Sequence, residues 1–437
     1  MDDFIVHDAE LTEQRLISHV DVPKSIQKYF KSSSLFIEYD TDITPNNSIL
    51  NIPLVATVLP LAWLTGSDIY VEELDRTFKE SMDELKQWFM KTYPNAPFTT
   101  EIKADVLVEN QIKANPSDRT GLLFSGGVDS SYSLITNLDL KPRLILFWGT
   151  DTYPYPENGA QWNKIIDTYS EFAERLGLKL NIVKTNISVL LDDRRISHDF
   201  HDVIYDGRFR FRMLHSFVLI PLVAPLSMGR FDHLIFSGGG PRDPNDTSIP
   251  EATLPEIDEK MIWADYKVSH WAPVHREEKI KALTEYFKND KVTLKVCINK
   301  LDQGKLNDST CEKCLKTIAN LALNGVDPNE YGFKVDDSTF QTLKTFIETG
   351  ISRSMFFTMN GWVQWQKSIP DQIPYDLYGS EAFFEWFKTV DLKTKEKNVW
   401  LYRDIYMKLP YSIAKPLDMV YNKMGIKIHD KNPPRHP

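Results

Sequence analysis

The sequence predicts an α/β protein whose central part is a parallel sheet covered by helices. Between residues 119 and 333, apolar runs of strand length alternate with segments whose apolar residues recur at helical spacing. This alternation is typical of a parallel sheet buried on both faces. The composition agrees, because 42% hydrophobic and 26% charged residues allow a large core and exclude general disorder. The length of 437 residues favours about three domains or lobes.

The predicted strands of this Rossmann-like core are five apolar runs, at residues 121–124, 144–148, 180–185, 234–236 and 292–297. Helices are predicted between them at residues 162–176 and 280–287, where apolar residues lie at helical spacing. A further apolar run, 213–228, contains His215, serines and prolines and is shorter than the roughly 20 residues that a membrane-spanning helix needs. We predict a buried helix there and no membrane association.

The parts on either side of the core are predicted to differ from it. Residues 1–118 combine strand-like runs at 35–39 and 102–108 with one amphipathic helix at 72–90, which indicates an α+β lobe of unknown role. The apolar stripe of that helix consists of Leu74, Phe78, Met82, Leu85 and Phe89. Residues 334–437 are predicted to form a helical, basic extension.

Charge restricts the partners. The whole chain has a net charge of −10, which argues against a general nucleic-acid binder. The segment from Asp391 onward nevertheless holds ten Lys and Arg against five Asp and Glu. It is either a solvated helical cap or a docking surface for RNA or a protein. The first residues, MDDFIVHDAE, resemble neither a secretory signal nor a transit peptide, so we expect a cytoplasmic protein.

The strongest chemical signal is a glycine-containing turn between a strand and a helix. The apolar run 121–124 leads directly into Ser125-Gly-Gly-Val-Asp-Ser-Ser131. Glycines let the backbone approach an anion closely, and a helix N-terminus adds free N–H groups and partial positive charge. The turn therefore predicts a pyrophosphate cradle. Asp129 would repel bare phosphate, so it either holds a magnesium ion or orients the loop.

Other nucleotide and hydrolase motifs are missing from the sequence. No G-x-x-x-x-G-K-[ST] occurs, no G-x-G-x-x-G follows a strand, and Leu123 stands where G-x-S-x-G needs its first glycine. A P-loop NTPase, a kinase and an α/β-hydrolase are therefore disfavoured.

Residues 125–130 resemble the S-G-G-x-D-S signature of the PP-loop ATP pyrophosphatases, and the overall pattern is closest to 7-cyano-7-deazaguanine synthase-like proteins. The resemblance implies an adenine nucleotide alpha-hydrolase fold, ATP and Mg²⁺ as cofactors, and cleavage of ATP between its α- and β-phosphates. It implies that Asp129 and Ser130 act in catalysis. The residues it implies for the nucleotide are Ser125, Gly126, Gly127, Asp129, Ser130 and Ser131 at the phosphates, and Gly149, Thr150 and Asp151 at adenine or ribose.

A second glycine-rich loop, Ser237-Gly-Gly-Gly-Pro-Arg-Asp243, follows the run 234–236. Carboxyl ends of parallel strands share one edge of the sheet, where ligands of open α/β folds bind. The loop loosely resembles the S-G-Y-P-D-C-R substrate loop of the deazaguanine synthases. We therefore expect Ser237, Gly238, Arg242 and Asp243 to contact substrate or magnesium, with an ordinary mobile Gly/Pro loop as the alternative. His270 and His275, near Arg276 and Lys279, have an open role in closing this site.

The three cysteines suggest a metal site. Cys311 and Cys314 form a C-x-x-C at a predicted helix start, and Cys297 ends a predicted strand, which supplies three of four tetrahedral positions. Asp308 stands where deazaguanine synthase-like proteins carry a fourth cysteine, and zinc accepts a carboxylate oxygen. The alternatives are a redox or sulfur-carrying pair and inert buried cysteines.

Together these features predict an enzyme that adenylates a carboxylate or carbonyl of a small molecule. Ammonia or an amine would then attack to give an amide, nitrile or amidine. One alternative is a tRNA-directed sulfurtransferase that uses Cys311 or Cys314. Another is an ATP-sensing subunit, without turnover, of a biosynthetic or defence system. A homodimer also stays open.

Overall fold

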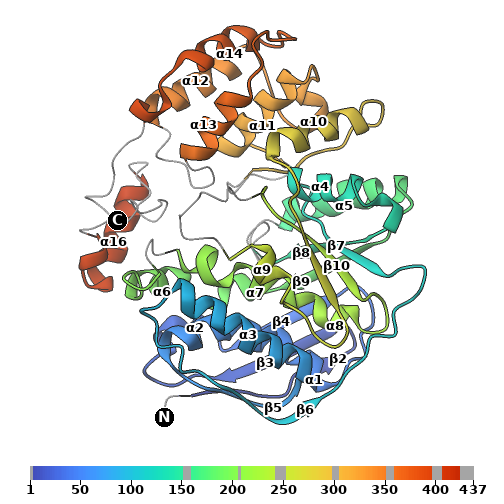
Figure 1. Cartoon of the computed structure of the whole chain (residues 1–437), viewed down its shortest axis with the longest axis vertical. Helices are drawn as coiled ribbons and strands as arrows, with labels where there is room; N and C mark the ends of the chain where they lie inside the picture. Colours follow the sequence, from blue (N-terminus) through green and yellow to red (C-terminus); the bar gives the residue numbers. More distant parts are fainter. Residues whose placement is uncertain are drawn as a thin grey trace.

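The computed structural model describes residues 3–150, 159–204, 208–241, 252–297, 305–350, 359–395 and 406–423. Within these residues the chain is an α/β protein built on one continuous, mostly parallel sheet of 11 strands (Figure 1). The strand order is β11-β10-β7-β8-β9-β4-β3-β1-β5-β6, and β2 pairs with β3. The N-terminal lobe lies at one end of the molecule and helices α12–α14 lie at the other (Figure 1).

The core half of the sheet is parallel throughout. Its strands are β7 (Thr120–Leu123), β8 (Arg143–Trp148), β9 (Leu180–Thr185), β10 (His233–Ser237) and β11 (Lys267–Trp271). Four of the five predicted strands are thereby confirmed. The fifth prediction, residues 292–297, is wrong, because this extended segment pairs with no strand among the described residues and its place in the sheet belongs to β11.

Side chains of the core strands alternate between two apolar clusters, one on each face. Leu122, Leu144 and Ile235 pack with helices α4 (Val128–Ile135), α5 (Gly159–Arg175), α10 (Arg276–Tyr286) and α11 (Glu312–Leu323). Leu123, Ile145 and Phe236 face the other side, toward α7 (His215–Leu219), α8 (Ala224–Ser227) and α9 (Pro255–Asp258). The predicted helices at 162–176 and 280–287 correspond to α5 and α10, which cover one face. Helices α7, α8 and α9 cover the other, so the sheet is buried on both faces.

The predicted helix at 213–228 is buried but interrupted. A π-helical turn at Arg210–Leu214 leads into α7, and a 3-10 turn at Pro221–Val223 separates α7 from α8. Pro221 and Pro225 explain the breaks, since a proline cannot donate the backbone hydrogen bond of a helix interior.

The N-terminal lobe continues the same sheet. Its strands are β1 (Phe4–Val6), β2 (Glu10–Thr12), β3 (Arg15–Asp21), β4 (Ser34–Tyr39), β5 (Ile69–Asp75) and β6 (Ile102–Val108). β4 pairs antiparallel with β9, with Ile37 opposite Thr185 and Tyr39 opposite Val183. The lobe and the core are therefore joined by strand pairing. The division at residues 118 and 333 stays a prediction.

Three helices of the lobe pack beside these strands: α1 (Asn47–Leu50), α2 (Ile52–Thr65) and α3 (Arg76–Thr92). The helix predicted from residue 72 begins only at Arg76, because residues 72–75 belong to β5 and Asp75 caps the helix through Phe78 N. All five residues of the predicted stripe are buried. The sequence reasoning missed α2, whose residues 52–64 are all buried and so show no periodicity.

The described part of the C-terminal extension is helical, as predicted. Helices α12 (Thr339–Gly350), α13 (Met359–Ser368) and α14 (Ser380–Thr389) pack on α11 around Trp362 and Trp365. Helix α16 (Tyr411–Lys423) lies apart from them, against α6 (Asp193–Asp199). Part of the basic segment, residues 396–405 and 424–437, lies outside the described residues. No helix in the described ranges combines the length and apolarity needed to cross a membrane.

Asp75 joins the lobe to the core, and we expect its removal to destabilise the protein. Its fully buried carboxylate accepts from Phe78 N at 2.8 Å, Ala264 N at 3.0 Å and Asn110 Nδ2 at 2.9 Å. Asp75→Ala should lower the free energy of unfolding in urea by about 2–3 kcal/mol, because it removes a helix cap and leaves buried donors unpaired. Asp83→Ala, which removes only an exposed pair with Lys79, should cost about 0.5 kcal/mol. Equal losses in the two variants would contradict this assignment.

Candidate functional site

The predicted phosphate loop lies at the carboxyl edge of the sheet, between β7 and α4. Gly126 has a φ of +71°, and a Cβ at this position would lie 1.8 Å from Tyr169 Oη, so only glycine fits. Gly127 is the N-cap of α4. Ser130 Oγ accepts from Ser125 N at 3.2 Å and donates to Gly127 O at 3.3 Å. The loop is therefore folded tightly over the start of the helix.

This loop faces a cavity of about 180 Å³. Ser125, Asp129 and Ser130 line it from the loop, Thr150 from the end of β8, and Ser237 from the end of β10. The remaining lining residues are mainly apolar: Leu123, Phe124, Ile145, Leu146, Phe147, His215, Leu219 and Phe236. Five of the predicted site residues, from three neighbouring parallel strands and their loops, thus meet at one cavity, as the cradle interpretation requires.

Other predicted residues support the loops without lining the cavity. Gly149 has a φ of +111°, and a Cβ there would lie 1.6 Å from Thr185 O, which fixes the turn after β8. Gly238 N donates to Trp271 O at 3.0 Å. Ser131 is fully buried inside α4. Asp151, Arg242 and Asp243 lie outside the described residues.

Asp129 is paired with two cations of α10. Its carboxylate accepts from Arg276 Nη1 at 3.0 Å and from Lys279 Nζ at 2.8 Å. Burial by itself would raise the pKa of Asp129, but the positive charges of Arg276, Lys279 and Lys313 outweigh it and hold the pKa below its ordinary 3.8. Of the two roles considered for Asp129, these ion pairs favour orienting the loop over holding magnesium.

Two cations share one carboxylate behind the loop. Arg276 and Lys279 both pair with Asp129, and the charge of Lys313 also acts on it. Lys279 is fully buried and also donates to Gly238 O at 2.7 Å and Gly239 O at 3.1 Å. Burial and the charge of Arg276 lower the pKa of Lys313 to about 8. A bound anion would relieve this excess.

The sequence reasoning did not assign these cations to the site. Arg276 and Lys279 were noted only as neighbours of His275. Their i, i+3 spacing, which places both on one face of a helix, was the signal that could have linked them.

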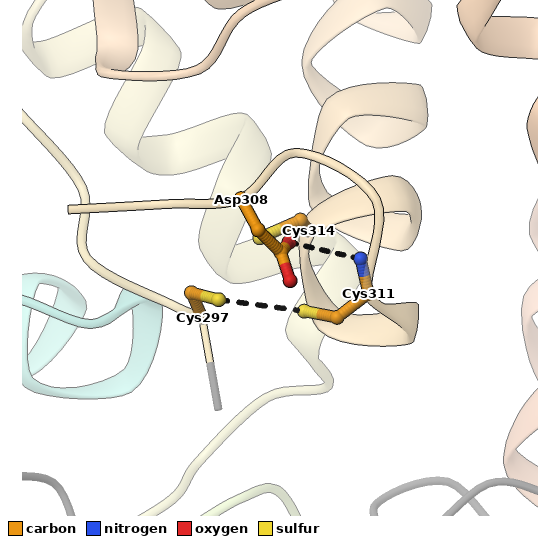
Figure 2. Close-up of side chains that lie close together, drawn as sticks. All are labelled: Cys297, Asp308, Cys311 and Cys314. Atoms are coloured by element: carbon orange, nitrogen blue, oxygen red, sulfur yellow. Dashed lines mark hydrogen bonds between the residues drawn. The ribbon is translucent and has the colours of Figure 1, made fainter. Parts of the chain in front are cut away.

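The predicted metal ligands converge (Figure 2). Cys297 ends the extended segment, Cys311 is the N-cap of α11, Cys314 lies in its first turn, and Asp308 precedes them. One potential ligand atom from each lies within 4.8 Å of the others. The Sγ atoms of Cys297 and Cys311 are 3.9 Å apart. Zinc–sulfur bonds of about 2.3 Å place two sulfurs about 3.8 Å apart around a tetrahedral ion, so this spacing fits a shared metal ion.

The surroundings of the cluster orient its ligands. Asp308 Oδ1 accepts from the backbone N of Thr310 and of Cys311, both at 2.9 Å, which points the carboxylate toward the sulfurs (Figure 2). Hydrogen bonding with Cys297 and Cys311, together with burial, raises the pKa of the Cys314 thiol. A divalent cation would reverse that preference and stabilise thiolates. The cluster could hold a metal ion such as zinc.

Two histidines lie on the α7–α9 side of the sheet. His215 follows the π-helical turn, lines the cavity, and its Nδ1 lies 2.9 Å from Thr253 Oγ1. His270 Nδ1 lies 2.6 Å from a carboxylate oxygen of the fully buried Asp258, and its ring packs against Gly238. His215 and Asp129 are the titratable side chains that line the cavity among the described residues.

Searches with protein-family models, among curated proteins and among solved structures found no match to this chain. The function of the chain is therefore inferred from the geometry of the loop, the cations and the cysteine cluster.

We expect the Asp129 ion pairs to stabilise the fold in a pH-dependent way. Asp129→Asn leaves Lys279 and Arg276 without their carboxylate, which should lower the free energy of unfolding by about 3 kcal/mol at pH 7. Because the folded-state pKa of Asp129 lies below 3.8, the wild-type advantage is complete above that pH. It is lost as the pH falls through the folded-state value.

Urea unfolding of both proteins between pH 7 and pH 3 measures this difference. Asp139→Asn, at an exposed position just after α4, is the matched control and should behave as wild type. A difference between Asp129→Asn and wild type that stays constant down to pH 3 would show that ionisation of Asp129 is not its source.

Proposed function

We propose that this chain is an AMP-forming ATP pyrophosphatase that adenylates a carboxylate or carbonyl of a small molecule for attack by ammonia or an amine. The observation that carries the proposal is the Ser125–Ser130 loop, which opens on a cavity beside an excess of cations. The assignment of the Rossmann-like core to the adenine nucleotide alpha-hydrolase type is part of the same proposal.

In this proposal the β- and γ-phosphates lie against the loop and the N-terminus of α4, where backbone N–H groups and hydroxyls are concentrated. Arg276 and Lys279 stabilise the negative charge that grows on the departing pyrophosphate. Thr150, at the end of β8, lies on the nucleoside side, and Ser237, at the end of β10, faces the acceptor. Both oxygens of Asp129 are already in ion pairs, so Mg²⁺ would be bound chiefly through the phosphates of ATP.

The cysteine cluster is proposed to bind structural zinc. Three thiolates and one carboxylate are a donor set that suits zinc, and four protein ligands close the site. Of the two cysteines that the sulfurtransferase alternative uses, Cys314 is fully buried and Cys311 is half-buried, whereas a sulfur carrier must reach its substrate. The cluster therefore favours a metal site over the sulfurtransferase alternative.

The proposal predicts the products formed from ATP and the residue that binds it. Incubated with ATP, Mg²⁺ and a small-molecule extract of cells, the chain should release AMP and pyrophosphate, detected by mass spectrometry. Lys279→Met should weaken ATP binding at least about tenfold in calorimetry, because the positive charge that holds Asp129 and the carbonyls of Gly238 and Gly239 behind the loop is lost. Lys281→Met, at an exposed position of the same helix, should bind ATP as wild type does.

Two outcomes decide against the enzyme. Release of ADP and phosphate would overturn the pyrophosphatase assignment, and ATP binding without AMP release would indicate the sensing subunit. Since Lys279→Met also unpairs Asp129, the double variant Lys279→Met/Asp129→Asn tests ATP binding with that charge removed.

The zinc site predicts a metal content that depends on each ligand. The purified chain should carry one zinc ion, and the Co²⁺-substituted protein should show thiolate-to-cobalt charge-transfer absorption. Cys311→Ser should lower zinc affinity strongly, whereas Asp308→Cys should raise it, because a fourth thiolate replaces the carboxylate. Unchanged zinc affinity in Cys311→Ser would show that this cluster does not bind the zinc.

A further inference from the structure

The phosphate loop is bonded to the segment that ends at the cysteine cluster. Lys295 N donates to Gly126 O at 2.8 Å. Tyr169 Oη lies 3.2 Å from Thr293 O and 3.4 Å from Gly126 O. A Cβ on Gly127 would lie 3.5 Å from Lys295 O. Residues 293–295 therefore pack directly against the phosphate loop and hydrogen-bond to it.

The same segment is held from the other side by Asn307. Asn307 Oδ1 accepts from Val296 N at 3.0 Å and Cys297 N at 3.1 Å, and its Nδ2 donates to Leu294 O at 2.7 Å. These bonds replace the strand pairing that the sequence predicted for the segment. A further bond runs from Leu294 N to Tyr331 O at 3.0 Å. Asn307 directly precedes Asp308, and the segment ends in Cys297, so these two attachments lead to the cluster.

We propose that metal binding at Cys297, Asp308, Cys311 and Cys314 fixes the phosphate loop in its nucleotide-binding conformation, with Asn307 as the positioning residue. Without the metal, no shared ion holds Cys297 against the 307–314 loop. Residues 293–295 then become more mobile, and their hydrogen bond to Gly126 weakens. The inference rests on the proposed function in one respect, that the loop binds ATP. By linkage, metal must strengthen ATP binding by the same factor by which ATP strengthens metal binding.

The test uses the full chain in zinc-loaded and chelator-stripped forms, with ATP affinity measured by calorimetry. We expect stripping to weaken ATP binding about tenfold or more, a coupling of ordinary size. We also expect saturating ATP to raise zinc affinity by the same factor, measured by competition with a chromogenic chelator. If stripping unfolds the chain, ATP would raise zinc affinity merely by binding the folded state, and the question is then decided by comparing Asn307→Ala with wild type, both zinc-loaded.

Variants separate the link from the metal site. Asn307→Ala keeps all four ligands, and its ATP affinity should be low and nearly independent of zinc. Asn324→Ala removes an asparagine whose Nδ2 donates to Asn320 O of α11 at 2.7 Å and should keep the wild-type coupling.

The outcomes distinguish the two proposals. Equal ATP affinity in loaded and stripped protein, with zinc affinity indifferent to ATP, would overturn the coupling and leave the proposed function intact. A loaded wild-type chain that does not bind ATP would overturn the proposed function and the coupling with it. Full coupling in Asn307→Ala would show that the link runs through other residues.

Discussion

A fully buried lysine needs a neutralising partner, and this requirement organises the candidate site. Lys279 of α10 meets it with Asp129, in the first turn of α4, and with the carbonyls of Gly238 and Gly239 after β10. Burying a charge without such partners costs a desolvation penalty on the order of several kcal/mol per ion. One side chain of α10 thus bonds to both the phosphate loop and the second glycine loop. Arg276 shares the carboxylate, so the site keeps a positive excess that an anion would balance.

The cysteine cluster, a short distance along the chain, requires a cation where the phosphate loop favours an anion. Three sulfurs and a carboxylate collected in a largely buried place are stabilised as thiolates only by a cation. An anion-seeking site and a cation-seeking site are thus separated by residues 294–297, whose backbone bonds to Gly126 on one side and to Asn307 on the other. Opposite charge preferences on the two sides of one segment are what makes mutual dependence between metal and nucleotide physically reasonable.

Sequence could predict the features that are local or repeated. Four core strands were predictable because strands buried on both faces appear as apolar runs, and Ser125–Ser130 was predictable because its residues are contiguous. β11 was missed because its sequence KVSHW is half polar and only Val268 of this strand is buried. Residues 292–297 looked like a strand because they are apolar, yet a side-chain amide takes the place of a neighbouring strand. The contact of Lys279 with Asp129 depends on how α10 docks, which no local pattern encodes.

The N-terminal lobe, whose role the sequence left open, has a structural part in the site. β9 would be an exposed edge of the parallel half-sheet, and an unpaired edge invites association; β4 covers it, and Asp40 extends the junction by accepting from Ile182 N at 2.8 Å. The lobe also holds the opposite wall of the cavity, since Tyr93 Oη donates to Arg212 O at 3.1 Å and Tyr39 Oη to Leu222 O at 3.0 Å. Arg212 precedes α7 and Leu222 follows it, so these bonds fix both ends of the helix, whose residue His215 lines the cavity. In the proposed function the shape of the acceptor side therefore depends on residues far from the phosphate loop, and the loop motif by itself would not determine the substrate.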